Sequence, residues 1–178
     1  MTAAGTASPS FEQAILPHLD AAYNLARWLV RDPAMADDIV QDACLRALQY
    51  FASFRGDDGR AWLLQIVRNA TYAKLKTRRS GVEVALDGMT DDDHREAIEI
   101  QDPGPGPEAA YARQEDLAQL DAALAALPVE LRECLVLCEL EQLSYKQIAH
   151  ITGVPIGTVM SRLWRARRLL TRSPGGEG

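Results

Sequence analysis

The spacing of the apolar residues constrains the fold most, because they recur every three or four positions along most of the chain. This spacing is typical of amphipathic α-helices, whose buried face repeats every 3.6 residues. No segment alternates apolar and polar residues with the two-residue period of a strand, and no Asn-Gly hairpin signal is present. We therefore predict an all-α fold, with helical stripes over residues 11–30, 33–52, 60–79, 115–127, 128–141 and 144–170.

The helical pattern is interrupted once, by an acidic segment that contains the sequence QDPGPGPEAA. Alternating proline and glycine is typical of a linker, since neither residue favours a helix interior. We predict two small helical modules joined by a flexible acidic linker. The predicted boundaries are a tail at 1–10, a first module at 11–80, the linker at 81–114, a second module at 115–173 and a tail at 174–178.

Charge is strongly segregated along this chain, although its net charge is only −6. Residues 60–79 and 144–172 each contain six lysines or arginines and no acid, whereas residues 83–116 are rich in aspartate and glutamate. Two basic blocks separated by an acidic connector indicate a polyanionic partner that is contacted twice. The alternative is that both blocks are simply solvated helix faces.

The segment LSYKQIAHITGVPIGTVMSRLWRARRLL, residues 143–170, has the pattern of a helix-turn-helix. Ser144 and Gln147 form a capping box for the first helix, and Gly153 supplies the positive φ that the turn requires. In the second helix the apolar face consists of Ile156, Val159, Leu163, Ala166 and Leu170, and the opposite face of Thr158, Ser161, Arg162, Arg165 and Arg168. Hydroxyls followed by arginines suit a helix in the major groove of DNA, although an ordinary surface helix is the alternative.

The remaining signals argue against an enzyme, a metal site and a membrane span. Cys134 and Cys138 lie one helical turn apart, but a zinc site needs four ligands, so we expect core cysteines. The acidic stretch 91–94 is expected to be solvated linker, and no nucleophile constellation is present. Three thiols, no signal peptide and no long apolar run favour a cytoplasmic protein without cofactors or membrane insertion.

Two segments of the chain resemble the bacterial extracytoplasmic-function (ECF) sigma factors. Residues 143–170 are similar to their C-terminal DNA-binding module, with Met160 and Trp164 where lysine and histidine are frequent. The stretch DIVQDACLRALQYFASFRGDDGRAWLLQIVRNATYAKLKTRR, residues 38–79, resembles their N-terminal module. The resemblance implies a subunit that binds core RNA polymerase at its clamp helices and flap, directs it to promoter DNA and is held by an anti-sigma factor.

The resemblance also implies two DNA-binding surfaces. The −35 element would be bound by the helix-turn-helix through Lys146, Pro155, Gly157, Thr158, Ser161, Arg162, Arg165 and Arg168. The melted −10 element would be bound by the N-terminal module through Phe54, Arg55, Asp57, Asp58, Arg60, Gln65, Arg68, Asn69, Lys74 and Lys76. Aromatic walls for a flipped base and cations for the phosphates are the groups that such a site needs. Phe51 and Trp62 are expected to be core aromatics instead.

Polymerase docking is expected on the helix that carries Asp37, Asp38, Ile39, Gln41 and Asp42. Acid and amide side chains around an apolar residue suit a basic docking surface, while acids at a helix N-terminus are also favoured by the helix dipole. Three rival functions remain open on the residues alone. They are a stand-alone repressor or activator, a sigma-like mimic that sequesters an anti-sigma factor, and an enzyme.

Overall fold

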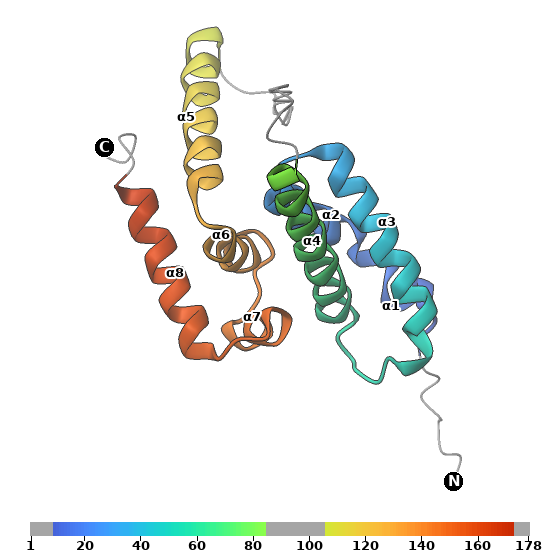
Figure 1. Cartoon of the computed structure of the whole chain (residues 1–178). Coiled ribbons are helices and arrows are strands. Elements are labelled where there is room, and N and C mark those ends of the chain that lie inside the picture. The colour runs from blue at the N-terminus through green and yellow to red at the C-terminus, as the bar shows by residue number, and fades with distance from the viewer. Residues whose placement is uncertain (1–8, 85–105, 173–178) are drawn as a thin grey trace.

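The computed structural model describes residues 9–84 and 106–172, and within these ranges every regular element is helical (Figure 1). The predicted all-α fold is therefore confirmed. The first module contains α1 (Phe11–Ala14), η1 (Leu16–His18), α2 (Leu19–Val30), α3 (Pro33–Tyr50), η2 (Phe51–Ser53) and α4 (Gly59–Val84). The second contains α5 (Pro107–Ala126), α6 (Val129–Leu135), the π-helical η3 (Val136–Leu140), α7 (Tyr145–Thr152) and α8 (Ile156–Thr171).

Local sequence signals account for the helix ends. Asp32 caps α3 by accepting a hydrogen bond from the Met35 amide at 3.2 Å, with Pro33 at the first helical position. The capping box of α7 is present, with Gln147 N donating to Ser144 Oγ at 3.1 Å and Ser144 N donating to Gln147 Oε1 at 2.9 Å. Gly153 ends α7 in the left-handed region at φ 71°. Each of these caps follows from residues no more than four positions apart.

Two boundaries differ from the prediction. Helix α5 begins at Pro107, so residues 107–114 are helical where the sequence suggested linker. The reason is that proline suits the first helical position and is followed by the helix-forming residues EAAYAR. Helix α4 continues to Val84, beyond the predicted end of the first module. Linker residues 85–105, including the acids at 91–94, lie outside the described residues.

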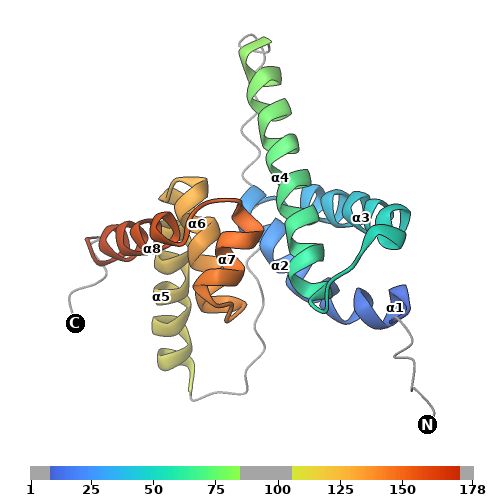
Figure 2. The same ribbon diagram turned by 90° about the horizontal axis from the view of Figure 1, so that it is seen from below.

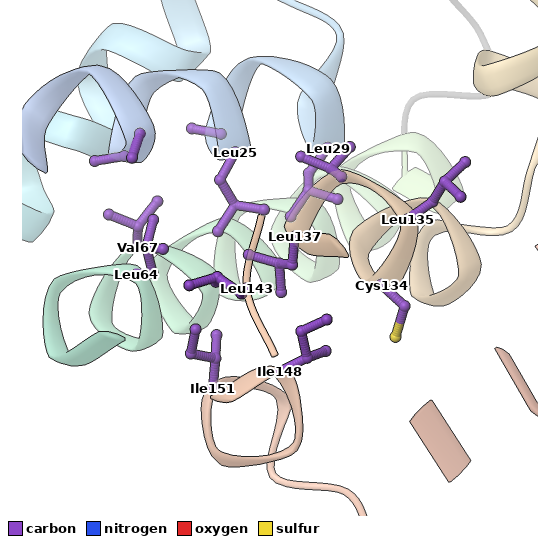
Figure 3. Packing of buried hydrophobic residues seen from close by; sticks show 14 of the residues in the cluster. Leu25, Leu29, Leu64, Val67, Cys134, Leu135, Leu137, Leu143, Ile148 and Ile151 are labelled. Carbon is purple, nitrogen blue, oxygen red and sulfur yellow. The ribbon is translucent and has the colours of Figure 1, made fainter. Parts of the chain in front are cut away.

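The two modules pack against each other around one continuous hydrophobic core. Helices α2 and α4 of the first module contact α6 and α7 of the second, and both views show these four helices side by side (Figures 1 and 2). Figure 3 shows the contact in detail, with Leu25, Leu29, Leu64 and Val67 on one side and Leu137, Leu143, Ile148 and Ile151 on the other. All eight of these side chains are buried. In the described ranges, no helix is both long enough and apolar enough to cross a membrane.

Gly59 is required by a close approach between α4 and the N-terminal segment. A β-carbon at this position would lie 2.2 Å from the carbonyl oxygen of Ala14, a contact that backbone atoms cannot relieve without moving. We expect Gly59→Ala to lower the free energy of unfolding by about 1–3 kcal/mol, the usual cost of overpacking. Thermal unfolding followed by circular dichroism measures it. The control is Gly81→Ala in the same helix, where the space is open and the stability should stay equal or rise.

Candidate nucleic-acid interface

Helix α8 presents a basic face to solvent, as the helix-turn-helix pattern predicts. Val159, Leu163 and Ala166 are buried against the rest of the module, so the opposite side of α8 faces solvent. Of the residues predicted to bind the −35 element, most are exposed and Thr158 is half-buried; the exposed ones are Lys146, Pro155, Gly157, Ser161, Arg165 and Arg168. The Arg168 guanidinium lies 5.1 Å from the ring centre of Trp164, which is itself exposed. This face can bind an anionic groove without rearranging α8.

Two residues of α8 depart from the predicted pattern. Ile156, expected in the core, is 44% exposed and is the first residue of α8. Arg162, expected on the DNA-binding face, is half-buried, and one of its guanidinium nitrogens is enclosed without a hydrogen-bond partner. Burial raises the pKa of both Glu133 and Cys134, and the Arg162 charge opposes both shifts, which places it near α6. In this conformation Arg162 is therefore not part of the exposed basic face.

The loop before α4 combines aromatic and acidic side chains. The rings of Phe54 and Trp62 are 5.0 Å apart between centres, and Phe51 stacks on Phe54 at 5.7 Å. All three rings are half-buried. The Asp58 carboxylate accepts a hydrogen bond from the Ala61 amide at 2.9 Å and so caps α4. Asp58, predicted to bind the −10 element, therefore has a helix-capping role here, while Asp57 is exposed.

An open pocket of about 460 Å³ lies between this loop and α7. The first module contributes Ser53, Phe54, Arg55, Gly56, Asp57, Asp58, Ala61 and Trp62, and α7 contributes Lys146, Gln147 and His150. Aromatic surface and cations meet here, as a pocket for a nucleobase requires. However, one wall belongs to the second module, where Gln147 Nε2 donates to Asp58 Oδ2 at 3.1 Å. The predicted −10 pocket is partly covered by the helix-turn-helix.

The polar residues of α4 fall into two groups. Asn69, Lys74 and Lys76 are exposed and Gln65 is half-buried. Arg60 and Arg68, by contrast, are paired with Glu141 and Glu133 of the second module, at 2.6 Å and 2.7 Å. Only part of the predicted −10 surface is therefore free in this conformation.

The predicted docking surface on α3 needs one correction and one addition. Asp37, Asp38, Gln41 and Asp42 are exposed, but Ile39 is fully buried and belongs to the core. The reason is that Ile39 shares the face of Ala43 and Ala47, four and eight residues further on. Leu45 and Leu48, two further apolar residues of α3, are exposed. Together with Phe11, Gln41 and Cys44 they line an open groove of about 350 Å³.

Comparison with known proteins agrees with this division into two modules. Residues 14–81 match the family model described as "Sigma-70 region 2", and residues 117–170 match "Sigma-70, region 4". The "RNA polymerase sigma-H factor" of Pseudomonas aeruginosa is 30% identical over 165 residues, which are 92% of this chain and 86% of that protein. The chain belongs to the sigma factor family.

Further relatives narrow this assignment to the ECF group. The "ECF RNA polymerase sigma factor SigE" of Mycolicibacterium smegmatis is 33% identical over 164 residues, which are 92% of this chain and 61% of that protein. Among solved structures, the sigma factor RpoE of Bartonella quintana, crystallised with the anti-sigma factor NepR, superposes with a TM-score of 0.77 and 30% identity. That superposition covers 94% of this sigma factor and 98% of the Bartonella chain. The ECF resemblance is thus confirmed.

As a member of this family the chain is a transcription initiation factor and not an enzyme, which removes the third rival function. Among the described residues, no group of three or more histidine, cysteine or acidic side chains is placed to hold a metal ion. Glu133 and Glu141 are the site residues that sequence reasoning missed, and Glu133 had a signal in the sequence. A single acid inside an apolar run, LRECLVL, was the available signal, since a charged residue at a core position needs a partner.

The buried thiol of Cys134 provides a test of the core assignment. Burial raises the pKa of Cys134 to about 11, with the nearby Glu133 adding to the effect. At pH 8 only about one thiol in a thousand would then be the reactive thiolate. We expect iodoacetamide to modify Cys44 and Cys138, both half-buried, well before Cys134 in the folded protein, as read by peptide mass spectrometry. Equal labelling of Cys134 and Cys138 without denaturant would contradict the packing; denatured protein is the control.

Proposed function

We propose that this sigma factor directs core RNA polymerase to its promoters by reading two DNA elements with two modules. Helix α8 lies in the major groove of the −35 element and contacts it through its exposed basic face. The loop at 54–58 and helix α4 hold the melted −10 strand, with Phe54 beside the flipped base and the α4 cations on the phosphates. The observation that carries the proposal is the acid-free, solvent-facing side of α8, on which Ser161, Arg165 and Arg168 are all exposed.

The polymerase contact is proposed for α3. Its exposed acids precede an exposed apolar patch at Leu45 and Leu48, so charge and apolar area adjoin on one helix. Such a combination suits a basic helical partner of the clamp-helix type, with the acids aiding association and the leucines supplying buried area. The second module would contact the flap. Because the polymerase acts in the cytoplasm, we place this factor there.

Control by an anti-sigma factor is part of the same proposal. The sigma factor RpoE of Bartonella quintana forms a complex with the anti-sigma factor NepR, and that sigma factor resembles this one over nearly its full length. We propose that a protein of this kind binds the present factor and holds its modules away from DNA and polymerase.

The test is run-off transcription with purified core polymerase on a library of genomic fragments. Promoter-specific transcripts that require this factor are expected, and their start sites give the recognised motif. Two results would overturn the proposal. One is a footprint by the free protein on a specific duplex together with no binding to core polymerase, as a stand-alone repressor would show. The other is a protein that binds an anti-sigma factor but supports no transcription, and whose anti-sigma binding is unchanged when the α8 arginines are replaced. A sigma-like mimic would show this result.

A further inference from the structure

Two glutamates of the second module lie against cations of the first. Glu133, on α6, has no solvent exposure, and its carboxylate accepts hydrogen bonds from Arg68 Nε at 2.7 Å and from the Tyr72 hydroxyl at 2.8 Å. Glu141 follows η3 and is also buried; its side chain accepts from Arg60 Nη2 at 2.6 Å. The same nitrogen donates to the Glu141 carbonyl at 2.7 Å. Both carboxylates therefore join the modules directly.

The partners of these glutamates belong to the surface proposed for the −10 strand. A guanidinium that is bonded to a buried carboxylate is not available to a phosphate, because both anions need the same N–H donors. Arg60 and Arg68 are thus neutralised from within the chain. Asp58 and Trp62 are covered by the same contact, since α7 forms one wall of their pocket. Glu133 and Glu141 thus take the hydrogen bonds of Arg68 and Arg60 that the proposed −10 contact assigns to phosphates.

The hydrogen bonds of the Glu133 carboxylate cross between the modules, while Arg162 of its own module lies near it as a further positive charge. Among the described residues, the hydrogen bonds to this carboxylate come from Arg68 and Tyr72, both on α4. Burial raises the pKa of the Glu133 carboxyl, and Arg68 opposes that effect. If the modules separated, the carboxylate would regain water, whereas in the closed form it depends on two donors that lie 65 and 61 residues away in sequence. A buried charge of this kind is tolerated only when it is paired.

A third hydrogen bond and an apolar contact accompany the two glutamates. Arg132 is buried and donates to the Leu29 carbonyl of the first module at 3.1 Å, as well as to carbonyls at the end of α5. The apolar contact of Figure 3 supplies the remaining area. The apolar contact leaves the guanidinium groups unpaired, whereas the glutamates accept hydrogen bonds from two cations of the surface proposed for the −10 strand. Glu133 and Glu141 are therefore the part of the contact that is specific for Arg68 and Arg60.

We propose that Glu133 and Glu141 are an autoinhibitory clamp that closes this sigma factor on itself before any protein partner binds. In the closed form the clamp withholds Arg60, Arg68 and the adjoining pocket from single-stranded DNA. Polymerase binding separates the modules, the two glutamates become solvated and the cations become free. An anti-sigma factor would then stabilise a conformation that the chain already adopts alone. The free factor consequently binds DNA weakly, because its apparent affinity is the affinity of the open form multiplied by the fraction of molecules that are open.

The experiment compares the full-length chain with the clamp variant Glu133→Gln/Glu141→Gln, without polymerase. Small-angle scattering gives the radius of gyration, and fluorescence anisotropy with a short labelled single-stranded DNA of mixed sequence gives the affinity at low salt. We expect the clamp variant to have a larger radius of gyration and to bind this DNA roughly tenfold more tightly, because the open fraction rises. Glutamine is close in size to glutamate, so the core volume is preserved.

The matched control is Glu130→Gln/Glu139→Gln, which also removes two negative charges, but from exposed positions of the same segment. Glu139 pairs with Arg167 inside its own module at 2.7 Å. We expect this control to stay compact and to gain only about twofold in affinity from general electrostatics. Equal gains in the control and the clamp variant would overturn the proposal. So would a clamp variant as compact as the parent, or a parent that is already expanded.

A milder variant keeps the test decisive if the clamp variant does not fold. Tyr72→Phe removes one hydrogen bond to Glu133 and leaves every charge in place. We expect a change in the same direction and of smaller size, and an unchanged radius and affinity would contradict the clamp. Since polymerase takes no part in these measurements, their outcome is independent of the transcription assay for the proposed function.

Discussion

Replacing Arg165 and Arg168 together with alanine is expected to reduce −35-dependent run-off transcription by roughly 30-fold or more. Each base-reading or phosphate-bound arginine contributes about 1–3 kcal/mol, and 1.4 kcal/mol is a factor of ten. Both side chains are exposed on α8, opposite the buried Val159, Leu163 and Ala166, so their loss leaves the packing of the helix intact. The measurement is transcription by core polymerase with each variant on the same promoter fragment.

The control for this loss is Arg172→Ala, which removes an exposed arginine just beyond the last turn of α8. We expect it to retain most of the activity. Binding of the double variant to core polymerase should be unchanged in a pull-down, since the proposed docking surface lies on α3. Full transcription by the double variant would show that α8 does not read the −35 element. Arg162→Ala is a useful third comparison, because this arginine is half-buried and is not part of the exposed basic face.

The largest expected effect on stability comes from Leu163→Ala. Leu163 is 1% exposed and lies on the face of α8 that packs against α6. Truncating a buried leucine removes transfer free energy and leaves a cavity, which together destabilise by about 2–5 kcal/mol. Denaturant unfolding followed by circular dichroism should therefore show a clearly lower midpoint. Because the core is continuous across the two modules, we expect the loss to appear in the main transition and not only in fraying of α8.

Leu169→Ala is the matched control in the same helix. Leu169 is 43% exposed, and leucine and alanine are both good helix formers, so the pair of variants differs mainly in burial. A change within about 0.5 kcal/mol is expected for this surface position. Similar losses for the two variants would indicate that α8 does not pack through the Leu163 face.

The helices, their caps and the turn of the helix-turn-helix were predictable from sequence. Asp32, Ser144 with Gln147, and Gly153 act on residues no more than four positions away, so a local pattern contains the whole interaction. The face of α8 followed from periodicity for the same reason. The separation of the basic blocks from the acidic connector is likewise a property of the residue order, and it indicates an anionic partner.

The assignment of single residues to surface or core was less secure where a helix has two apolar faces. In α3 the spacing of Ile39, Ala43 and Ala47 competes with that of Leu45 and Leu48, and periodicity alone does not say which face meets α2 and α4. The structure buries the first set and exposes the second. The helix itself was therefore predicted correctly, while its orientation depended on neighbours that are distant in sequence.

The amino-acid sequence predicts that this protein is built of helices, in two modules, with two basic surfaces suited to DNA. Which of those cations are free depends on how the two modules pack. Arg68 meets Glu133 across 65 residues of sequence, and Arg60 meets Glu141 across 81. Pairing over such distances depends on how complete modules pack, a property that no local pattern contains. The availability of the −10 surface is consequently set by the closed arrangement and not by the composition of α4.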